Sequence, residues 1–120
     1  MRPHQRLDLW KRSMDFVVAT YRATDQFPKE EKFGLTSQLR RAAVSVAANI
    51  AEGAAKTSTK DFRRYSSNSQ GSTSEIETEL LIAQRLNYLA EADFMLLSKD
   101  LDDVGRMISG LSRSLQRREA

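Results

Sequence analysis

The sequence contains no cysteine and a single histidine among its 120 residues. Without cysteine, the chain has no disulfide framework, no zinc–thiolate site and no thiol nucleophile. The histidine, His4, precedes the first expected helix, so it cannot activate a serine or complete a Glu-x-x-His metal site in the helical body. We therefore expect a protein that is not an enzyme, with no catalytic residue, no metal ligand and no cofactor.

Long apolar runs and phosphate-binding glycine motifs are missing as well. No apolar run approaches the roughly 20 residues of a membrane span. The charged N-terminal residues lead into no apolar segment of the kind found in signal peptides. Neither Gly-x-x-x-x-Gly-Lys nor Gly-x-Gly-x-x-Gly occurs. These absences predict a soluble, cytoplasmic protein with no membrane partner.

Four stretches of the chain repeat apolar residues at intervals of three and four, which is typical of amphipathic helices. The clearest stripe consists of Phe94, Leu97, Leu101, Val104, Ile108, Leu111 and Leu115. The four patterns predict helices at about residues 7–25, 35–54, 59–87 and 91–117. Because short connections favour antiparallel neighbours, we expect an all-α, up-down antiparallel four-helix bundle that forms one domain of residues 1–120.

Local signals mark the expected helix ends. Pro28 disfavours helix just before it, so the first helix should end ahead of this residue. Gly53 is placed to stop the second helix. Ser58, with Asp61 three residues later, resembles a capping box at the start of the third helix. Asn87 is a natural left-handed cap at the end of that helix.

The weak apolar stripe of the third expected helix, and apolar residues off the main stripes of the first and fourth, indicate packing beyond one chain. The stripe of the first helix consists of Leu7, Trp10, Met14, Val17, Val18 and Tyr21. The stripe of the third consists of Phe62, Tyr65, Ser69, Ser72, Ile76, Leu80, Ala83 and Leu86, and its serines bury little apolar area. Phe16, Leu96 and Met107 lie off the main stripes, and burying them between subunits would add to a thin core. We expect a homo-oligomer; the alternative is that these are isolated exposed apolar residues, which are common.

Two groups of polar residues on the second and third expected helices need an interpretation. Asn49 falls on the apolar stripe of the second helix, where its amide needs partners, and Glu75 or Thr78 of the third helix could supply them. Such a buried network usually sets helix register rather than chemistry. Glu75, Glu77 and Glu79 form an acidic cluster that we interpret as solvated or salt-bridged.

Charge is unevenly distributed along the chain. Residues 35–64 carry six basic and two acidic groups, whereas residues 75–103 carry eight acidic and two basic groups. The basic residues are Arg40, Arg41, Lys56, Lys60, Arg63 and Arg64. In a helical hairpin they could hold the phosphates of RNA or DNA, with Tyr65 offering a stacking face. Alternatively, they form a solvated face that pairs with the acidic region, within one chain or between subunits.

Several short motifs follow one another in a specific order. They are Leu9-Trp10-Lys11, Phe27-Pro28-Lys29-Glu30-Glu31-Lys32-Phe33-Gly34-Leu35, Gln38-Leu39-Arg40-Arg41-Ala42-Ala43-Val44-Ser45, Asn49-Ile50-Ala51-Glu52-Gly53, Gly71-Ser72 and Glu75-Ile76-Glu77-Thr78. In this order they resemble the bacterial four-helix bundle family known as 23S rRNA intervening-sequence proteins, over about residues 7–115. The chain departs from the family's pattern at residues 65–70, which are polar where an apolar run is usual, and at Thr73.

The resemblance implies a bundle that assembles as a ring-shaped homopentamer, in a family whose members mostly have no established activity. A related branch, the accessory variability determinant of diversity-generating retroelements, is a basic pentamer that binds nucleic acid and a reverse transcriptase. Asn49, Glu52, Gly53 and Glu75 match signature positions that we expect to be structural. We thus expect a non-enzymatic oligomeric bundle that binds RNA or DNA through its second and third helices. The alternative is a scaffold or adaptor that binds another protein and has no nucleic-acid role.

Overall fold

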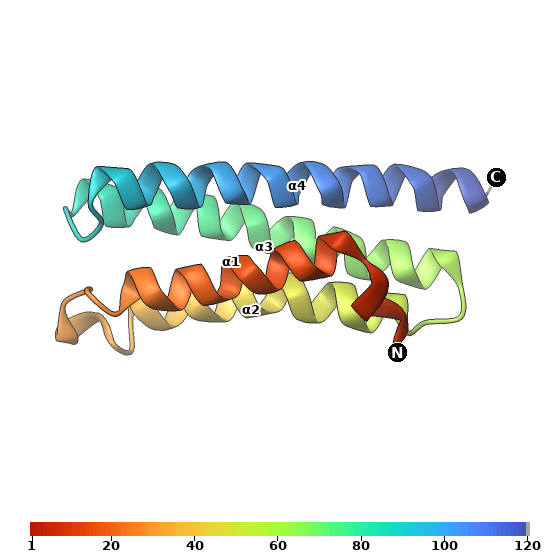
Figure 1. The fold of residues 1–120 in the computed structure, drawn as a ribbon, viewed down its shortest axis with the longest axis horizontal. Coiled ribbons are helices and arrows are strands. Elements are labelled where there is room, and N and C mark those ends of the chain that lie inside the picture. Colours follow the sequence, from red (N-terminus) through yellow and green to blue (C-terminus); the bar gives the residue numbers. More distant parts are fainter. Residues whose placement is uncertain (120) are drawn as a thin grey trace.

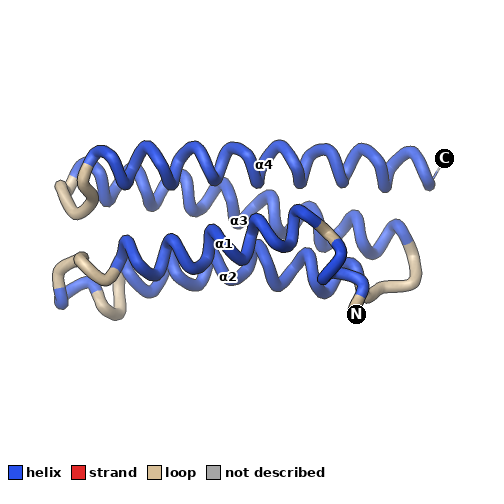
Figure 2. The backbone as a smooth tube through the Cα atoms, in the orientation of Figure 1, coloured by secondary structure: helices blue, strands red, loops and turns tan. Residues whose placement is uncertain are grey.

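The computed structural model describes residues 1–119, so Ala120, the last residue of the expected domain, lies outside the described part. Four helices make up most of the chain: α1 (Asp8–Thr24), α2 (Leu35–Ala54), α3 (Thr59–Arg85) and α4 (Glu91–Glu119). Two short 3₁₀ helices, η1 (Pro3–Arg6) and η2 (Lys29–Glu31), precede α1 and α2. Residues 1–119 contain no strand, as Figure 2 shows. The prediction of an all-α four-helix bundle is confirmed, and each helix begins and ends within two residues of its expected bounds.

The bundle is 47 Å long and 21 Å across in both other directions. Following the chain, α1 packs on α2, α2 on α3 and α3 on α4, and α4 closes the bundle against α1 (Figure 1). The α1–α2 and α3–α4 connections lie at one end, here called the hairpin end (residues 25–34 and 86–90). Both chain termini and the α2–α3 connection lie toward the other, here called the terminal end (residues 1–6, 52–64 and 113–119). Within the described chain, no helix has the length and apolar character needed to cross a membrane.

The helix ends follow the local signals except at Gly53. The Ser58 side chain accepts a 3.0 Å hydrogen bond from the Asp61 main-chain N–H at the start of α3. Asn87 adopts the left-handed conformation, with φ of 60°, just beyond the end of α3. Gly53 does not stop α2, which continues through it to Ala54 without a positive φ. The prediction for Gly53 was therefore wrong, and its role lies in the packing of α2 against α3.

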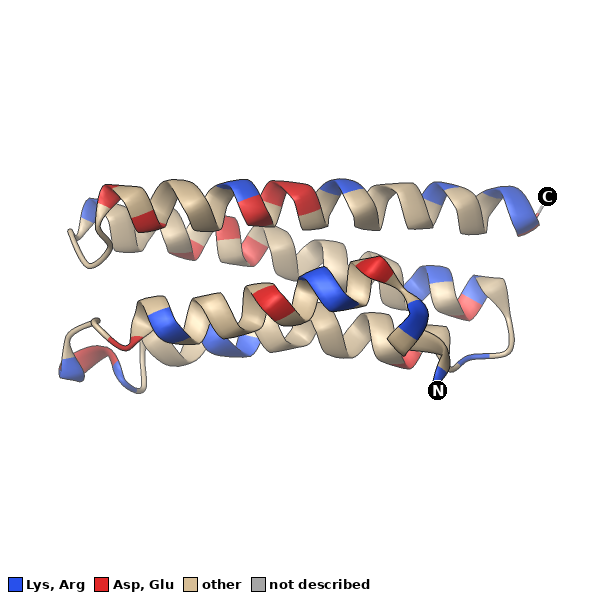
Figure 3. Ribbon diagram, viewed as in Figure 1, with Lys and Arg blue, Asp and Glu red and all other residues tan. Residues whose placement is uncertain are grey.

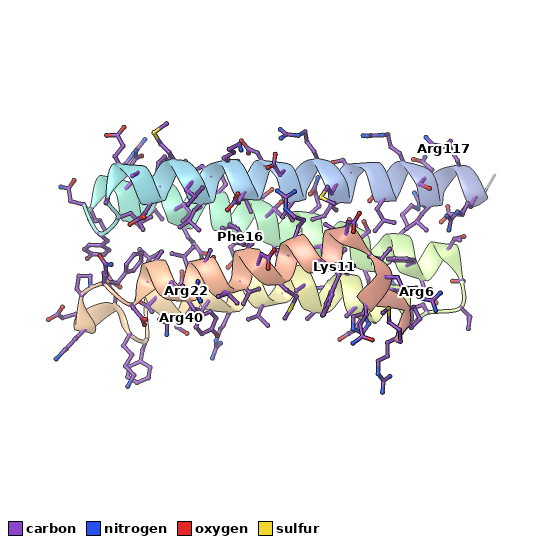
Figure 4. All side chains as sticks on the ribbon, in the orientation of Figure 1. Arg6, Lys11, Phe16, Arg22, Arg40 and Arg117 are labelled. Carbon is purple, nitrogen blue, oxygen red and sulfur yellow. The ribbon has the colours of Figure 1, made fainter. Side chains whose placement is uncertain are left out.

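The buried face of α1 differs from the expected stripe. Leu9, Ser13, Phe16, Thr20 and Thr24 are the buried residues of this helix. Met14, Val18 and Tyr21 of the expected stripe are exposed, while Phe16, expected off the stripe, is only 2% exposed. Its side chain points from α1 toward α3 and α4 (Figure 4).

Hydrogen bonds within the helix explain the shift. The hydroxyls of Ser13, Thr20 and Thr24 each donate to the main-chain carbonyl four residues earlier, at 2.7, 2.9 and 2.8 Å. A buried hydroxyl whose hydrogen bond is satisfied in this way costs little, so these polar residues can face the core. The apolar stripe read from the sequence is thereby turned toward the surface.

Helix α3 packs through small polar side chains. Ser66 and Ser69 are fully buried: Ser66 shares a 2.7 Å hydrogen bond with Ser112 of α4, and Ser69 donates one of 2.8 Å to the Val46 carbonyl of α2. The serines thus join α3 to both neighbours rather than leaving its packing thin. The end of the expected stripe is wrong, because Leu86 is 50% exposed.

The C-terminal stripe is confirmed. Leu97, Leu101, Val104, Ile108 and Leu115 of α4 are buried, and Phe94 and Leu111 are partly buried. Of the other two residues expected off the stripes, Met107 packs against the core, whereas Leu96 is exposed. Helix α4 therefore supplies a continuous apolar face along the length of the bundle.

Candidate nucleic-acid interface

The terminal end of the bundle gathers basic side chains from three segments. The basic residues there are Arg2, Arg6, Lys56, Lys60, Arg63, Arg64, Arg113, Arg117 and Arg118, against three acidic ones, Glu52, Asp61 and Glu119. Figure 3 shows this gathering at the start of α3 and the end of α4. The two helices meet through Arg63, whose guanidinium bonds both carboxylate oxygens of Glu119 at 3.1 and 3.0 Å. The up-down topology therefore joins two basic segments that are about 50 residues apart in the chain.

Arg113, Arg117 and Arg118 were missed as candidate site residues. The signal was available, because the segment after Val104 carries four arginines and one glutamate. An antiparallel α3–α4 pair places this segment beside the start of α3. Combining the charge count with the topology would have found them.

The structure separates Arg40 and Arg41 from the other four predicted basic residues. Fourteen residues of helix at 1.5 Å each put Arg40 about 21 Å from the end of α2 at Ala54, and Lys56 lies beyond that end. Arg40 lies toward the hairpin end, whereas Arg117 lies at the terminal end (Figure 4). The set that the sequence grouped together is therefore two groups, one toward each end.

Arg40 is already used within the chain. Its guanidinium donates to Thr24 Oγ1 at 2.8 Å and to the Tyr21 carbonyl at 3.2 Å, and pairs with Asp25 at 3.1 Å. The guanidinium also lies over the Tyr21 ring, 4.6 Å from its centroid. These contacts fasten the end of α1 to α2, whereas Arg41 is exposed.

The basic side chains at the terminal end differ in their exposure and in their contacts with neighbouring residues. Lys60 is exposed, and Arg64 is exposed with only a loose 3.8 Å pair to Asp61. Lys56 and Arg64 both lie over the Tyr65 ring, at 5.3 and 4.9 Å from its centroid. Because its own neighbours cover this ring, Tyr65 holds cations in place rather than offering a free stacking face.

The four signature residues have structural surroundings. Asn49 is half-buried and donates to the carbonyl and the hydroxyl of Ser45, at 2.8 and 3.0 Å. Ser72 of α3 donates to the same Ser45 hydroxyl at 3.0 Å, so a polar network links α2 to α3. The expected partners Glu75 and Thr78 are not used: Glu75 is exposed, and Thr78 bonds the Ser74 carbonyl of its own helix. Glu52 is also exposed, and Gly53 is buried where α2 meets α3.

The acidic cluster of α3 contains one buried carboxyl group that the sequence interpretation missed. Glu75 and Glu77 are exposed as expected, but Glu79 is only 5% exposed, and its Oε1 has no hydrogen-bond partner in residues 1–119. Burial, and then the negative charge of Glu75 one turn away, raises the pKa of Glu79 to about 7. Its spacing from Ile76 and Ala83 on the core face was the signal. No group of three or more possible metal ligands occurs in the described chain.

The displaced stripe of α1 forms an apolar surface with α2, here called the α1–α2 face. A shallow hollow of about 240 Å³ lies there, lined by Trp10, Met14, Val17, Val44, Ala47, Ala48 and Ala51. Val18 and Tyr21 extend the face and are 45% and 42% exposed. A face made of neighbouring large apolar side chains is typical of a protein contact surface.

Comparisons with known proteins agree with the architecture. A model of the 23S rRNA-intervening sequence protein family matches residues 5–110. The fold is similar to the crystal structure of a protein of unknown function from the S23 ribosomal protein family of Bacteroides thetaiotaomicron VPI-5482. The two share 20% sequence identity at a TM-score of 0.78, over 87% of this chain and 97% of the other. No curated protein matches the chain.

Proposed function

Because the chain belongs to the 23S rRNA-intervening sequence protein family, we propose that it is a non-enzymatic, homo-oligomeric helical module that binds RNA or DNA through its terminal end. The observation that carries this proposal is the gathering of nine basic residues against three acidic ones where α3 begins and α4 ends. Clustered Lys and Arg side chains neutralise phosphates and release counterions, which drives binding without chemistry.

The α1–α2 face supports the oligomeric part of the proposal. Its apolar centre is flanked by exposed Lys11, Arg22 and Arg41. Toward the hairpin end, α3 and α4 also carry exposed apolar side chains, with Leu81 beside Glu77 in the groove between the two helices and Met95 and Leu96 on α4. Contact between two different faces is heterologous, and it generates a closed ring when the rotation permits. The five subunits of the family's ring would each use both faces.

A ring also strengthens the nucleic-acid proposal. Rotation about a common axis points every subunit in the same direction, so bundles that stand along this axis present all terminal ends on one side. Several basic ends then contact one strand, and linked contacts raise the overall affinity well above that of one subunit. The proposal therefore predicts tighter binding by the assembled protein than by a monomeric variant.

Titration of a labelled RNA oligonucleotide at several salt concentrations tests the function. Affinity should fall steeply as salt rises from about 50 to 200 mM, since phosphate contacts dominate. The double variant Arg63→Ala, Arg64→Ala should bind more weakly, whereas Lys29→Ala, Lys32→Ala, which removes the same charge at the hairpin end, should bind like the unaltered protein. Absence of binding even at the lowest salt would reject the proposal.

The second candidate is a scaffold whose α1–α2 face binds a different protein, and the same apolar surface favours it. Light scattering at micromolar concentration separates the two. A mass of several subunits supports self-association through this face. A monomer mass would refute the homo-oligomer and leave the face for another partner.

A further inference from the structure

A polar trench leads away from the terminal end between α3 and α4. Its entrance is a shallow hollow of about 380 Å³ beside Lys60 and Arg64, which is lined by α3 residues alone and shares Arg63 and Ser67 with the next hollow, of about 350 Å³. The second hollow lies between α3 and α4 and shares Arg113 with the third, of about 610 Å³, which reaches the middle of α4. The second and third hollows therefore form the trench, and the first adjoins it on the surface of α3.

Small, hydrogen-bonded side chains make the floor of this trench. Gln70 of α3 donates a 2.8 Å hydrogen bond to the Ser109 hydroxyl of α4, and one turn along, Ser66 and Ser112 share a bond of 2.7 Å. Gly105 has no side chain to fill the space above it. The floor is thus polar and held in place from both helices, and it retains hydroxyl and amide groups that can bond a ligand.

The charges along the trench are graded. From the terminal end inward, the walls carry Lys60 and Arg64 beside Asp61, then Arg63, Arg113 and Arg106, of which Arg106 pairs with Asp103. Arg113 forms no ion pair with any residue from 1 to 119, and it lies about 10 Å along α4 from Arg106. The innermost hollow ends at Glu77 and Asp102, whose carboxylates would repel an anion. The trench is therefore basic at the terminal end and acidic at the middle of the bundle.

We propose that the basic part of this trench, from Lys60 to Arg106, binds the phosphodiester backbone of a single nucleic-acid strand, with Arg113 as its central contact. This inference rests on the proposed function and extends it to residues outside the sequence-based set. Arginine binds phosphate oxygens, and Ser67, Gln70 and Ser109 supply the hydroxyl and amide contacts that proteins make to phosphate and sugar. No aromatic side chain lines the three hollows, so the trench provides no base stacking and reads no sequence.

The test compares two double variants that remove equal charge. Arg106→Ala, Arg113→Ala removes the trench cations, and Lys29→Ala, Lys32→Ala removes two exposed lysines at the hairpin end. The probes are fluorescent oligo(U), oligo(A) and oligo(dT) of about 20 nucleotides, long enough to cover several contacts. We expect the trench variant to bind all three about tenfold more weakly. Its plot of log affinity against log salt should be shallower by about 1.4, since each lost single-strand phosphate contact removes about 0.7.

Each outcome decides one claim. A trench variant that binds with the affinity and salt slope of its matched control overturns the trench, and so does a preference of more than about tenfold for one base. Suppose that the unaltered protein binds, that the loss of Arg63 and Arg64 weakens binding, and that the trench variant binds as tightly as the unaltered protein. In that case only the trench proposal is rejected, and the proposed function stands. If the unaltered protein binds no oligonucleotide at low salt, the proposed function fails with it. A circular dichroism melt confirms that both variants are folded.

Discussion

Gly53 of α2 lies directly against Phe62 of α3, so that a Cβ atom placed on Gly53 would come within 2.7 Å of the Phe62 ring carbon Cδ1. The same atom would lie 2.9 Å from the Cβ of Tyr65. The two helices approach this closely next to the turn that connects them. Gly53, which the family resemblance predicts to be a structural position, thus allows α2 and α3 to pack closely next to the basic terminal end.

We predict that Gly53→Ala destabilises the protein although alanine is the better helix former. Overpacking of this kind costs about 1–3 kcal/mol. Gly105→Ala is the matched control, because nothing lies within 4 Å of its added Cβ, and it should stabilise the helix by up to about 1 kcal/mol. Urea unfolding of the two variants measures the difference. Equal stability of both would show that α3 moves aside without cost.

Glu79→Gln should change how stability depends on pH. The folded protein holds the Glu79 pKa at about 7, above the ordinary glutamate value of 4.5, so the folded state binds the extra proton between these values. Stability should therefore fall as pH rises from about 4.5 to 7 and stay level above this range, a loss of about 3 kcal/mol. The variant lacks this loss and should exceed the unaltered protein in stability at pH 8 but not at pH 4.

Chemical denaturation across this pH range checks the prediction for Glu79. Glu77→Gln is the control, since Glu77 is exposed on the same helix and should leave the pH profile unchanged. An unaltered protein whose stability stays constant between pH 5 and 7 would contradict a buried, neutral carboxyl group.

Val18→Glu should convert the proposed homo-oligomer to a monomer. Val18 is 45% exposed on the α1–α2 face, so the single chain tolerates the change, but a buried unpaired carboxylate would disfavour a subunit contact. Phe33→Glu is the control, because Phe33 is 89% exposed near η2 and lies outside both proposed contact faces. Light scattering should show a reduced mass for Val18→Glu alone. Retention of the full mass would place the interface elsewhere.

Arg40→Ala should lower stability without weakening nucleic-acid binding. The variant loses the hydrogen bonds to Thr24 and to the Tyr21 carbonyl, which together contribute about 1–2 kcal/mol. Arg64→Ala should weaken nucleic-acid binding and leave stability nearly unchanged, since Arg64 is exposed at the terminal end and makes only a loose ion pair. Thermal melts and oligonucleotide titrations on both variants separate the two roles. Weaker nucleic-acid binding by Arg40→Ala would show that the basic residues toward the hairpin end also contribute to binding.

Much of the architecture was predictable because local chemistry determines it. Apolar residues at intervals of three and four mark where helices form, and residues such as Ser58 and Asn87 end them through contacts with their own neighbours. Short connections then leave an antiparallel bundle as the simple arrangement. These features depend on residues a few positions apart, so one sequence contains them.

The site was predicted less well, because it depends on which helix faces meet. Arg40 and Lys56 belong to one basic segment of the sequence, yet a helix carries them toward opposite ends. Arg63 and Arg113 are far apart in the sequence, yet the α3–α4 pairing lines one trench with both. Charge counts along a chain do not contain these distances.

The sequence by itself determined that this protein is four amphipathic helices, where each begins and ends, and which family the ordered motifs resemble. Only the tertiary structure decided that Phe16 turns inward while Val18 turns outward, and that Glu79 is buried. The physical reason is that periodicity ranks helix faces by apolar content alone. Hydroxyls that bond their own helix, such as Thr20, let a polar face enter the core. Serines that bond the next helix, such as Ser69, do so only once the helices have packed.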